Sequence, residues 1–290
     1  MEAKLDRSVE DVGNITKLEH VNVTIPDQQL ATLFYVAGLG LTRDPYIMVS
    51  TNNMWINVGR SQFHLPTGKP QNLRGCSAIV VPDRKELLER LGNVKKQLEG
   101  SKFEYREGND CVDTVSPFGD RIRCHFPDPA RFGRIKLGMP YIEFDVAPKA
   151  ADGIARFYRE VMGAPSRVKE NGHGRAAHVA VGPDQEFVFR ETDRPIPDYD
   201  GHHIQVYIND FTGPYKKLGK LDLISMENGQ HEYRFIDIVD LDSKKVLFKL
   251  EHEVRSSRHP LNGRPLVNRN PAQTNTAYMP GFDGLEWFLA

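Results

Sequence analysis

One phrase recurs four times along this 290-residue chain. Each copy opens on a short run of alternating residues typical of a strand, turns at Asp or Pro, continues as an amphipathic helix and ends on three further strand-like runs. A βαβββ unit of about 60 residues cannot complete a stable sheet alone, so we expect the units to pair. The four opening runs are HVNVTI at 20–25, CSAIVV at 76–81, YIEFDV at 141–146 and HIQVYI at 203–208.

Apolar residues at helical spacing predict one helix in each copy, each ending at or near a glycine or a polar turn. The predicted helices span residues 27–36, 83–98, 150–162 and 211–218. We therefore expect an α+β fold in which four βαβββ units pair into two incomplete-barrel domains. The expected divisions are an N-terminal segment at 1–16, paired domains at 17–128 and 139–254, and an extended arm at 255–290.

The balance of charge and the lack of long apolar runs exclude several classes of protein. Lys plus Arg number 38 and Asp plus Glu number 39, so the formal net charge is -1 and no basic excess favours nucleic acid. No run of about 18 apolar residues is present, and the first residues contain no apolar core of a secretory signal. Three cysteines without CxxC spacing favour a reducing compartment. We expect a cytoplasmic protein without nucleic-acid or membrane partners.

The pattern resembles the vicinal oxygen chelate superfamily of glyoxalases, bleomycin-resistance proteins and extradiol dioxygenases. The resemblance extends over about residues 17–253, and its most specific strings are Ser116-Pro-Phe-Gly-Asp-Arg-Ile122 and Gly201-His-His-Ile204. It implies that paired units surround a cleft, and that four units match the layout of the ring-cleaving extradiol dioxygenases. Members that bind a metal take its ligands from the first and last strands of paired units.

This resemblance places a divalent metal ion, iron, manganese or zinc, in the C-terminal half. His203 falls on the first-strand ligand position, and Lys249 or Glu251 falls on the last-strand position, of which we favour Glu251. Tyr141 stands where extradiol enzymes have a further histidine, so His178 is our candidate for the third ligand.

Proton transfer needs a tyrosine or histidine that faces the cleft. Strand alternation turns either Tyr233 or Arg234 toward the cleft, without fixing which. We take Tyr141 and Tyr233 as the candidate catalytic residues.

The N-terminal half offers a weaker set of ligands. His20 occupies its first-strand position, and Gln62 and His64 share one face of the closing strand. Arg123 stands where a carboxylate is expected, which argues against a metal in this half. The C-terminal half alone is therefore expected to hold the metal, although His20, His64 and His125 could converge as three imidazoles.

The leading functional hypothesis is a metal-dependent enzyme that acts on a small oxygenated compound, such as an aromatic diol, in the manner of an extradiol dioxygenase. A lyase or isomerase of the glyoxalase or epimerase kind is the first alternative. A metal-free protein that binds a small molecule, as resistance proteins do, is the second.

The chain stops alternating after Val254. Residues 255–275 are rich in Pro, Arg and Asn, and four large aromatics follow: Tyr278, Phe282, Trp287 and Phe288. Exposed aromatics at this density are unfavourable unless they pack. We expect an extended arm that crosses either the first half or a partner subunit. The second alternative would make the protein a homodimer.

Overall fold

A computed structural model of the chain describes residues 6–47, 50–172 and 174–269. The element order strand, helix and three strands occurs in each of the four expected units, numbered here first to fourth along the chain. The tail aromatics lie outside the described residues. A short 3-10 helix, Arg7–Glu10, precedes the first unit, and α3, Pro129–Phe132, lies between the second and third units.

The first and fourth units supply eight of the strands. The first unit contains β1 (Ile15–Asn22), α1 (Gln28–Ala31), a π-helical segment (Thr32–Gly38), β2 (Thr42–Arg43), β3 (Asn53–Val58) and β4 (Ser61–Pro66). The fourth unit contains β13 (His203–Ile208), α5 (Thr212–Lys220), β14 (Ile224–Glu227), β15 (Glu232–Val239) and β16 (Val246–Ser256).

The second and third units supply the other eight strands. The second unit contains β5 (Gly75–Val80), α2 (Arg84–Val94), β6 (Glu104–Glu107), β7 (Val112–Val115) and β8 (Arg121–His125). The third unit contains β9 (Gly138–Val146), α4 (Ala151–Phe157), a π-helical segment (Tyr158–Met162), β10 (Ser166–Asn171), β11 (Gly174–Gly182) and β12 (Gln185–Glu191).

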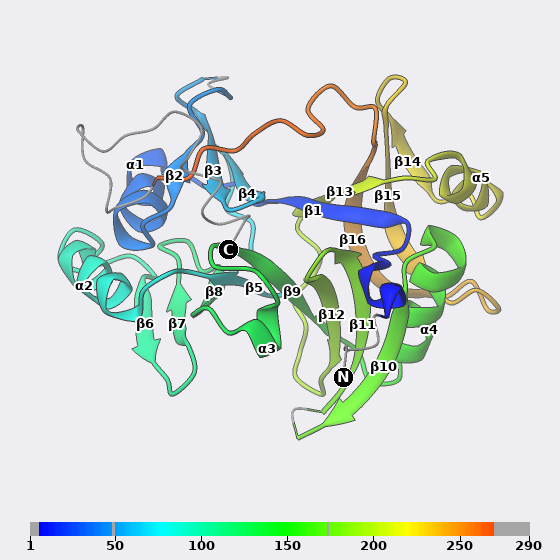
Figure 1. Ribbon diagram of the computed structural model, residues 1–290, viewed down its shortest axis with the longest axis horizontal. Helices are drawn as coiled ribbons and strands as arrows, with labels where there is room; N and C mark the ends of the chain where they lie inside the picture. The colour runs from blue at the N-terminus through cyan, green and yellow to red at the C-terminus, as the bar shows by residue number, and fades with distance from the viewer. Residues whose placement is uncertain (1–5, 48–49, 173, 270–290) are drawn as a thin grey trace.

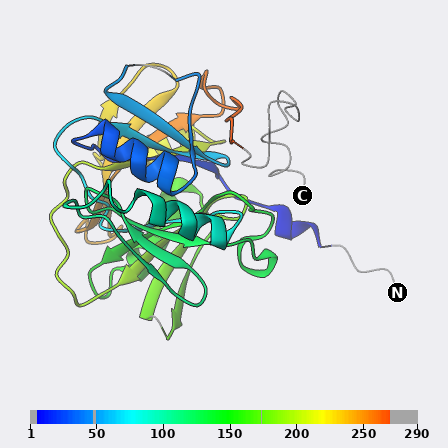
Figure 2. The same cartoon turned by 90° about the vertical axis from the view of Figure 1, so that its left-hand side faces the viewer.

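Aspartate caps start the first two helices where the sequence predicts them. The carboxylate of Asp27 accepts hydrogen bonds from the backbone N–H of Gln29 and Leu30, and Asp83 accepts one from Glu86. These bonds satisfy N–H groups that have no partner inside the helix. α1 and α2 then lie side by side on one flank of the molecule (Figure 2).

The strands form two eight-stranded sheets, but the units that share a sheet are not the expected ones. The first sheet has the order β14-β15-β16-β13-β1-β4-β3-β2 and joins the fourth unit to the first. The second has the order β10-β11-β12-β9-β5-β8-β7-β6 and joins the third unit to the second. Figure 1 shows the first sheet above and the second below. The expected pairing within 17–128 and within 139–254 is therefore wrong.

The pairing follows from the edges that each unit leaves open. In every unit the first strand lies beside the last, and its other edge is free to bind a second unit. β1 pairs with β13 and β5 pairs with β9, both antiparallel. Because all four first strands present the same kind of edge, the repeat predicts that units pair without predicting which ones.

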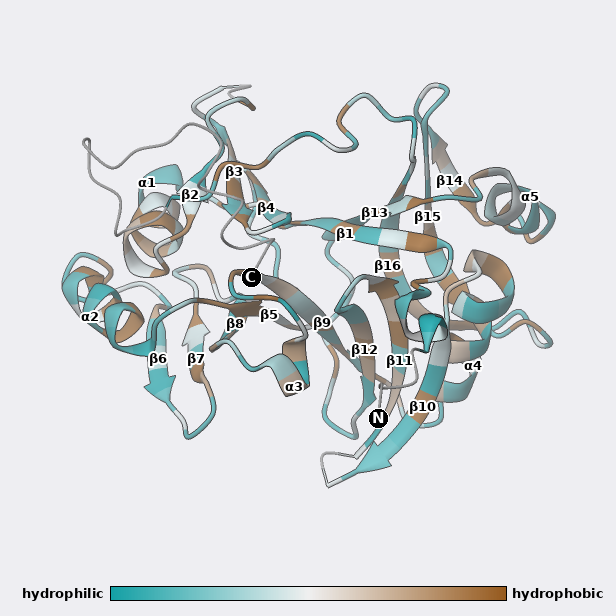
Figure 3. Cartoon of the chain, in the orientation of Figure 1, coloured by the Kyte–Doolittle hydropathy of each residue, from teal (hydrophilic) through white to brown (hydrophobic). Residues whose placement is uncertain are grey.

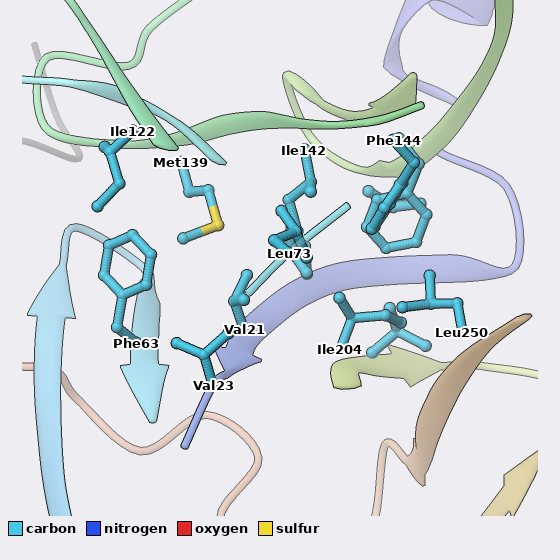
Figure 4. Packing of buried hydrophobic residues seen from close by; sticks show 14 of the residues in the cluster. Val21, Val23, Phe63, Leu73, Ile122, Met139, Ile142, Phe144, Ile204 and Leu250 are labelled. Carbon is cyan, nitrogen blue, oxygen red and sulfur yellow. The ribbon is translucent and has the colours of Figure 1, made fainter. Parts of the chain in front are cut away.

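The hydrophobic core lies between the two sheets. Figure 4 shows Val21, Phe63 and Ile204 of the first sheet facing Ile142 and Phe144 of the second. All five side chains are at most 2% exposed. Neighbouring residues of a strand point to opposite faces of a sheet. The residues directly before and after each of these core residues therefore point to the other face.

The outer strands are polar. β6 and β10, at the ends of the second sheet, are mostly hydrophilic in Figure 3, and their unpaired edges meet solvent with charged side chains. Charges at a sheet edge oppose pairing with another chain. Within the described residues, every helix is too short or too polar to cross a membrane.

Candidate metal centre

Three histidines converge on the face of the first sheet that points away from the core. His20 lies on β1, His64 on β4 and His203 on β13, and these strands are neighbours. One ring nitrogen from each histidine lies within 4.8 Å of the others. We call these three residues the histidine cluster. It is the one group of its kind among the described residues, and it draws on both halves of the chain.

The ladder of the first sheet explains this convergence. Val21 of β1 pairs with Ile204 of β13, so a local two-fold axis through this pair exchanges His20 with His203. The same axis exchanges His64 of β4 with Glu253 of β16, because each lies one pair further along its own parallel ladder. Four potential ligands therefore surround one axis.

Four of the six ring nitrogens of the cluster are buried without a hydrogen-bond partner. His20 is fully buried and His203 is 9% exposed. Nε2 of His20, Nε2 of His203 and both nitrogens of His64 are buried without a partner. An unsatisfied buried polar atom is costly, and several of them at one point call for a common partner. Imidazole nitrogens suit zinc, iron and related divalent metals, so the donor set fits such an ion.

Burial favours the neutral form of two of these imidazoles, those of His64 and His203. Burial, together with the nearby imidazoles of His20 and His203, lowers the pKa of His64 to about 2. Its ring stacks on Trp55, with the ring centroids 3.8 Å apart. Burial also lowers the pKa of His203. A neutral imidazole is the form that binds a metal.

Glu253 is the fourth donor beside the cluster. Its Oε2 lies 3.5 Å from Nε2 of His203, which is too long for a good hydrogen bond. Arg234 at 2.6 Å and Arg255 at 2.5 Å hold the carboxylate in place. Although burial raises the pKa of Glu253, His203 and these arginines bring it well below its ordinary value, so the group is ionised.

The structure brings together only part of the predicted ligand set. Oε2 of Glu251 lies 3.4 Å from Nδ1 of His203, as expected for neighbours on β16 and β13. His178 is not part of this group. It lies on β11 of the second sheet, where Nδ1 is 3.0 Å from Oε2 of Glu186. The expected third ligand is thus held elsewhere, because the third unit does not share a sheet with the fourth.

The two predicted catalytic tyrosines lie away from the histidine cluster. Tyr141 is on β9 of the second sheet, and its hydroxyl is 2.9 Å from Nε2 of His125. Tyr233 points into the core against Phe211, with ring centroids 4.9 Å apart. Arg234, the other alternative on β15, is the side chain that reaches the site. His125 likewise does not join His20 and His64.

The matching face of the second sheet has a different character. Its charged side chains pair with one another: Arg123 with Asp113, Arg190 with Glu143 and His178 with Glu186. Cavities of about 470 and 700 Å³ lie over this face. Because opposite charges already face each other there, no set of bare nitrogens like the histidine cluster arises among its described residues.

The segment after β16 crosses the first unit. In Figure 1 it runs from β16 over to β2 and β3. Nη1 of Arg264 is 2.8 Å from the buried carboxylate of Asp44, and Nη2 donates to Gln62 at 3.2 Å. Asn268 exchanges two hydrogen bonds with the backbone of Gly59. Gln62 pairs with His20 in the sheet, so the segment reaches the edge of the histidine cluster.

Sequence reasoning found all three histidines but assigned them to two different sites. It missed Glu253, although Glu251 and Glu253 share a face of β16 and the alternation alone allows either. The missing information was the pairing of the first unit with the fourth, which sets His64 and Glu253 on opposite sides of one point.

No protein-family model matches the sequence, and no curated protein matches it. Among solved structures, the chain is similar to glyoxalase I from Zea mays, with a TM-score of 0.56, 13% identity, and coverage of 83% of this chain and 92% of that one. It is also similar to a candidate dioxygenase from Bacillus subtilis, with a TM-score of 0.55, 13% identity, and coverage of 88% and 91%. The two sheets and their strand order, taken with these likenesses, show that the chain has the vicinal oxygen chelate fold in its four-unit form.

Proposed function

We propose that the chain is a metal-dependent enzyme that binds a divalent ion through His20, His64, His203 and Glu253 and acts on a small oxygenated compound. Two observations carry this proposal: four buried ring nitrogens of the cluster have no partner, and one ring nitrogen from each histidine lies within 4.8 Å of the others. A divalent ion bound there would polarise and hold two adjacent oxygen atoms of a substrate. The two similar structures support only the fold, and the proposed reaction is argued from the residues of the site.

Other side chains on the same face would hold the substrate. Gln205 stands between His20 and Glu253 in the ladder, is fully buried and has neither amide atom bonded. Trp55 offers a ring face and an unbonded Nε1–H. These two residues would orient the substrate and exclude water.

Tyr207 supplies a hydrogen-bond donor on this face, because its hydroxyl has no partner. Burial and the nearby charge of Glu19 raise the pKa of Tyr207 to about 12. Its hydroxyl therefore stays protonated at neutral pH and can donate a hydrogen bond to an oxygen atom of the substrate.

A lyase or isomerase reaction is the second candidate, and Glu251 favours it. This carboxylate lies beside the cluster, 3.4 Å from His203 and 3.2 Å from Arg234. A carboxylate at this position could remove a proton from carbon next to a carbonyl group. A metal-free binding role is less well supported, because it leaves the ring nitrogens of the cluster without partners.

The test starts with elemental analysis of the freshly purified protein. The protein is then stripped with a chelator and reloaded separately with Fe(II), Mn(II) and Zn(II). Oxygen uptake with aromatic vicinal diols would identify a dioxygenase. Exchange of the α-proton of hydroxycarbonyl compounds in D₂O, without oxygen uptake, would identify the lyase or isomerase. Less than about a tenth of an equivalent of metal after reloading at micromolar concentration would overturn both.

A further inference from the structure

Glu19 and His20 share one side of the sheet although they are adjacent in sequence. Neighbouring residues of a regular strand point to opposite faces. Here β1 departs from regularity between Leu18 and His20: Leu18 pairs with Val206, while His20 pairs with the next residue back, Gln205. Glu19 is the extra residue of this bulge, and a bulge redirects side chains in this way.

The bulge lets Glu19 hold the imidazole of His20. Oε2 of Glu19 lies 2.6 Å from Nδ1 of His20, and the glutamate is 2% exposed. An ionised carboxylate only accepts hydrogen bonds, so Nδ1 must carry the proton. Nε2, which has no partner in the structure, is then left with its lone pair free.

A second glutamate lies beside the first-strand histidine of the fourth unit, although it comes from the last strand, β16, and not from the first strand as Glu19 does. Oε2 of Glu251 lies 3.4 Å from Nδ1 of His203, and it also contacts Arg234 at 3.2 Å. Each first-strand histidine therefore has Nδ1 beside a glutamate. The contact to His20 is shorter and is not shared with an arginine in this way, so it restrains the ring more strongly.

We propose that Glu19 is a positioning residue that fixes His20 with its proton on Nδ1 and turns Nε2 toward the metal, with Glu251 as a weaker counterpart at His203. This inference rests on the proposed metal site. Carboxylates that hold ligating histidines in this way set both the ring orientation and the basicity of the ligating nitrogen. Glu251, expected from the sequence to be a ligand, thus acts through His203, and Glu253 is the ligand.

The role of Glu19 can be separated from a merely structural one by measuring two properties. The first is the dissociation constant of Zn(II), determined by competition with a chromophoric chelator. Glu19→Gln keeps a weaker acceptor and is expected to raise this constant about ten-fold, and Glu19→Met about 100-fold, with the stoichiometry unchanged. Glu251→Gln is expected to raise it less than Glu19→Gln.

Glu186→Gln is the matched control. It alters a glutamate that contacts Nδ1 of a histidine, His178, but in the second sheet. Its zinc affinity should equal that of the unsubstituted protein. Unchanged affinity in both Glu19 variants, or an equal loss in the Glu186 variant, would overturn the proposal.

The second property is the tautomer of His20 in the metal-free protein, observed by ¹⁵N NMR of the imidazoles. The Nδ1–H form is expected in the unsubstituted protein, and the Nε2–H form should become populated in Glu19→Met. A predominant Nε2–H form in the unsubstituted protein would overturn the positioning role. This measurement needs no metal. It therefore tests the contact between Glu19 and His20 even if the protein does not bind zinc and the proposed function is wrong.

Discussion

The imidazole rings of His20 and His203 lie 5.7 Å apart, although one comes from the first unit and the other from the fourth. They occupy equivalent places on two antiparallel strands, so each is the counterpart of the other about the local two-fold axis. Neither half of the chain contains the candidate site by itself. The predictions below follow from this arrangement and from the contacts around it.

Replacing His64 with Ala should weaken metal binding by at least about 100-fold, because it removes a direct donor from the cluster. His125→Ala is the matched control: it also removes a buried histidine with a lowered pKa, but in the second sheet. Metal content after dialysis against a fixed zinc concentration measures both. Retention of metal in the His64 variant, or loss in the His125 variant alone, would contradict the assignment.

The two glutamates of β16 should differ in their effect on the metal. Glu253→Gln removes the charge of the proposed ligand, so the dissociation constant should rise more than in Glu251→Gln, where only the support of His203 is weakened. A chelator competition carried out on both variants in parallel gives the ratio. The reverse order would restore Glu251 as the ligand.

Replacing Arg264 with Met should destabilise the protein by about 3 kcal/mol, since it leaves the buried carboxylate of Asp44 without its ion-pair partner. Arg258→Ala, at an exposed position of the same segment, should change stability by less than about 0.5 kcal/mol. Urea unfolding of the two variants compares them. Equal free energies of unfolding for the two variants would mean that the segment does not bind the first unit in solution.

The turn at Asp120 should make stability depend on pH. Burial and the charge of Asp200 raise the pKa of Asp120 from 3.8 to about 7, against hydrogen bonds from Leu73 and Ser116 that lower it. Between these values the folded state binds more protons than the unfolded state, so stability falls as pH rises. The stabilisation that protonated Asp120 gives to the folded state is complete below pH 3.8 and is lost as the pH rises through about 7.

Asp120→Asn should remove this dependence, which can amount to a few kcal/mol. Unfolding midpoints at several pH values between 4 and 8 would show the unsubstituted protein losing stability relative to the variant as pH increases. Asp110→Asn, at an exposed position, should follow the unsubstituted protein. Parallel curves for Asp120→Asn and the unsubstituted protein would refute the raised pKa.

The sequence was sufficient for the elements of the fold but not for their pairing. Helices begin after Asp27 and Asp83 because these residues cap locally, and local signals can be read from a sequence. The choice between pairing β1 with β5 or with β13 is made by the whole core, to which Val21 and Ile204 contribute from distant parts of the chain.

The candidate site was predictable residue by residue and not as a group. His20, His64 and His203 stand on first or last strands, which is why they were singled out. The sequence predicts His178 and not His20 as the third metal ligand alongside His203, because it predicts that consecutive units pair. The role of Glu19 depends on a bulge in β1. The sequence of β1 around this bulge contains no glycine or other turn residue that would predict it.

The pairing of β1 with β13 has a consequence for how the protein is made. The ribosome releases the first unit long before the fourth, so β1 must wait with an open edge while the second and third units are synthesised. Those two units can join at once, since they are consecutive. Contacts between distant parts of a chain form slowly, and an unpaired strand edge is prone to aggregate in the meantime. Completion of the histidine cluster therefore depends on synthesis of the fourth unit, and a chain terminated before it would contain His20 and His64 without His203 and Glu253.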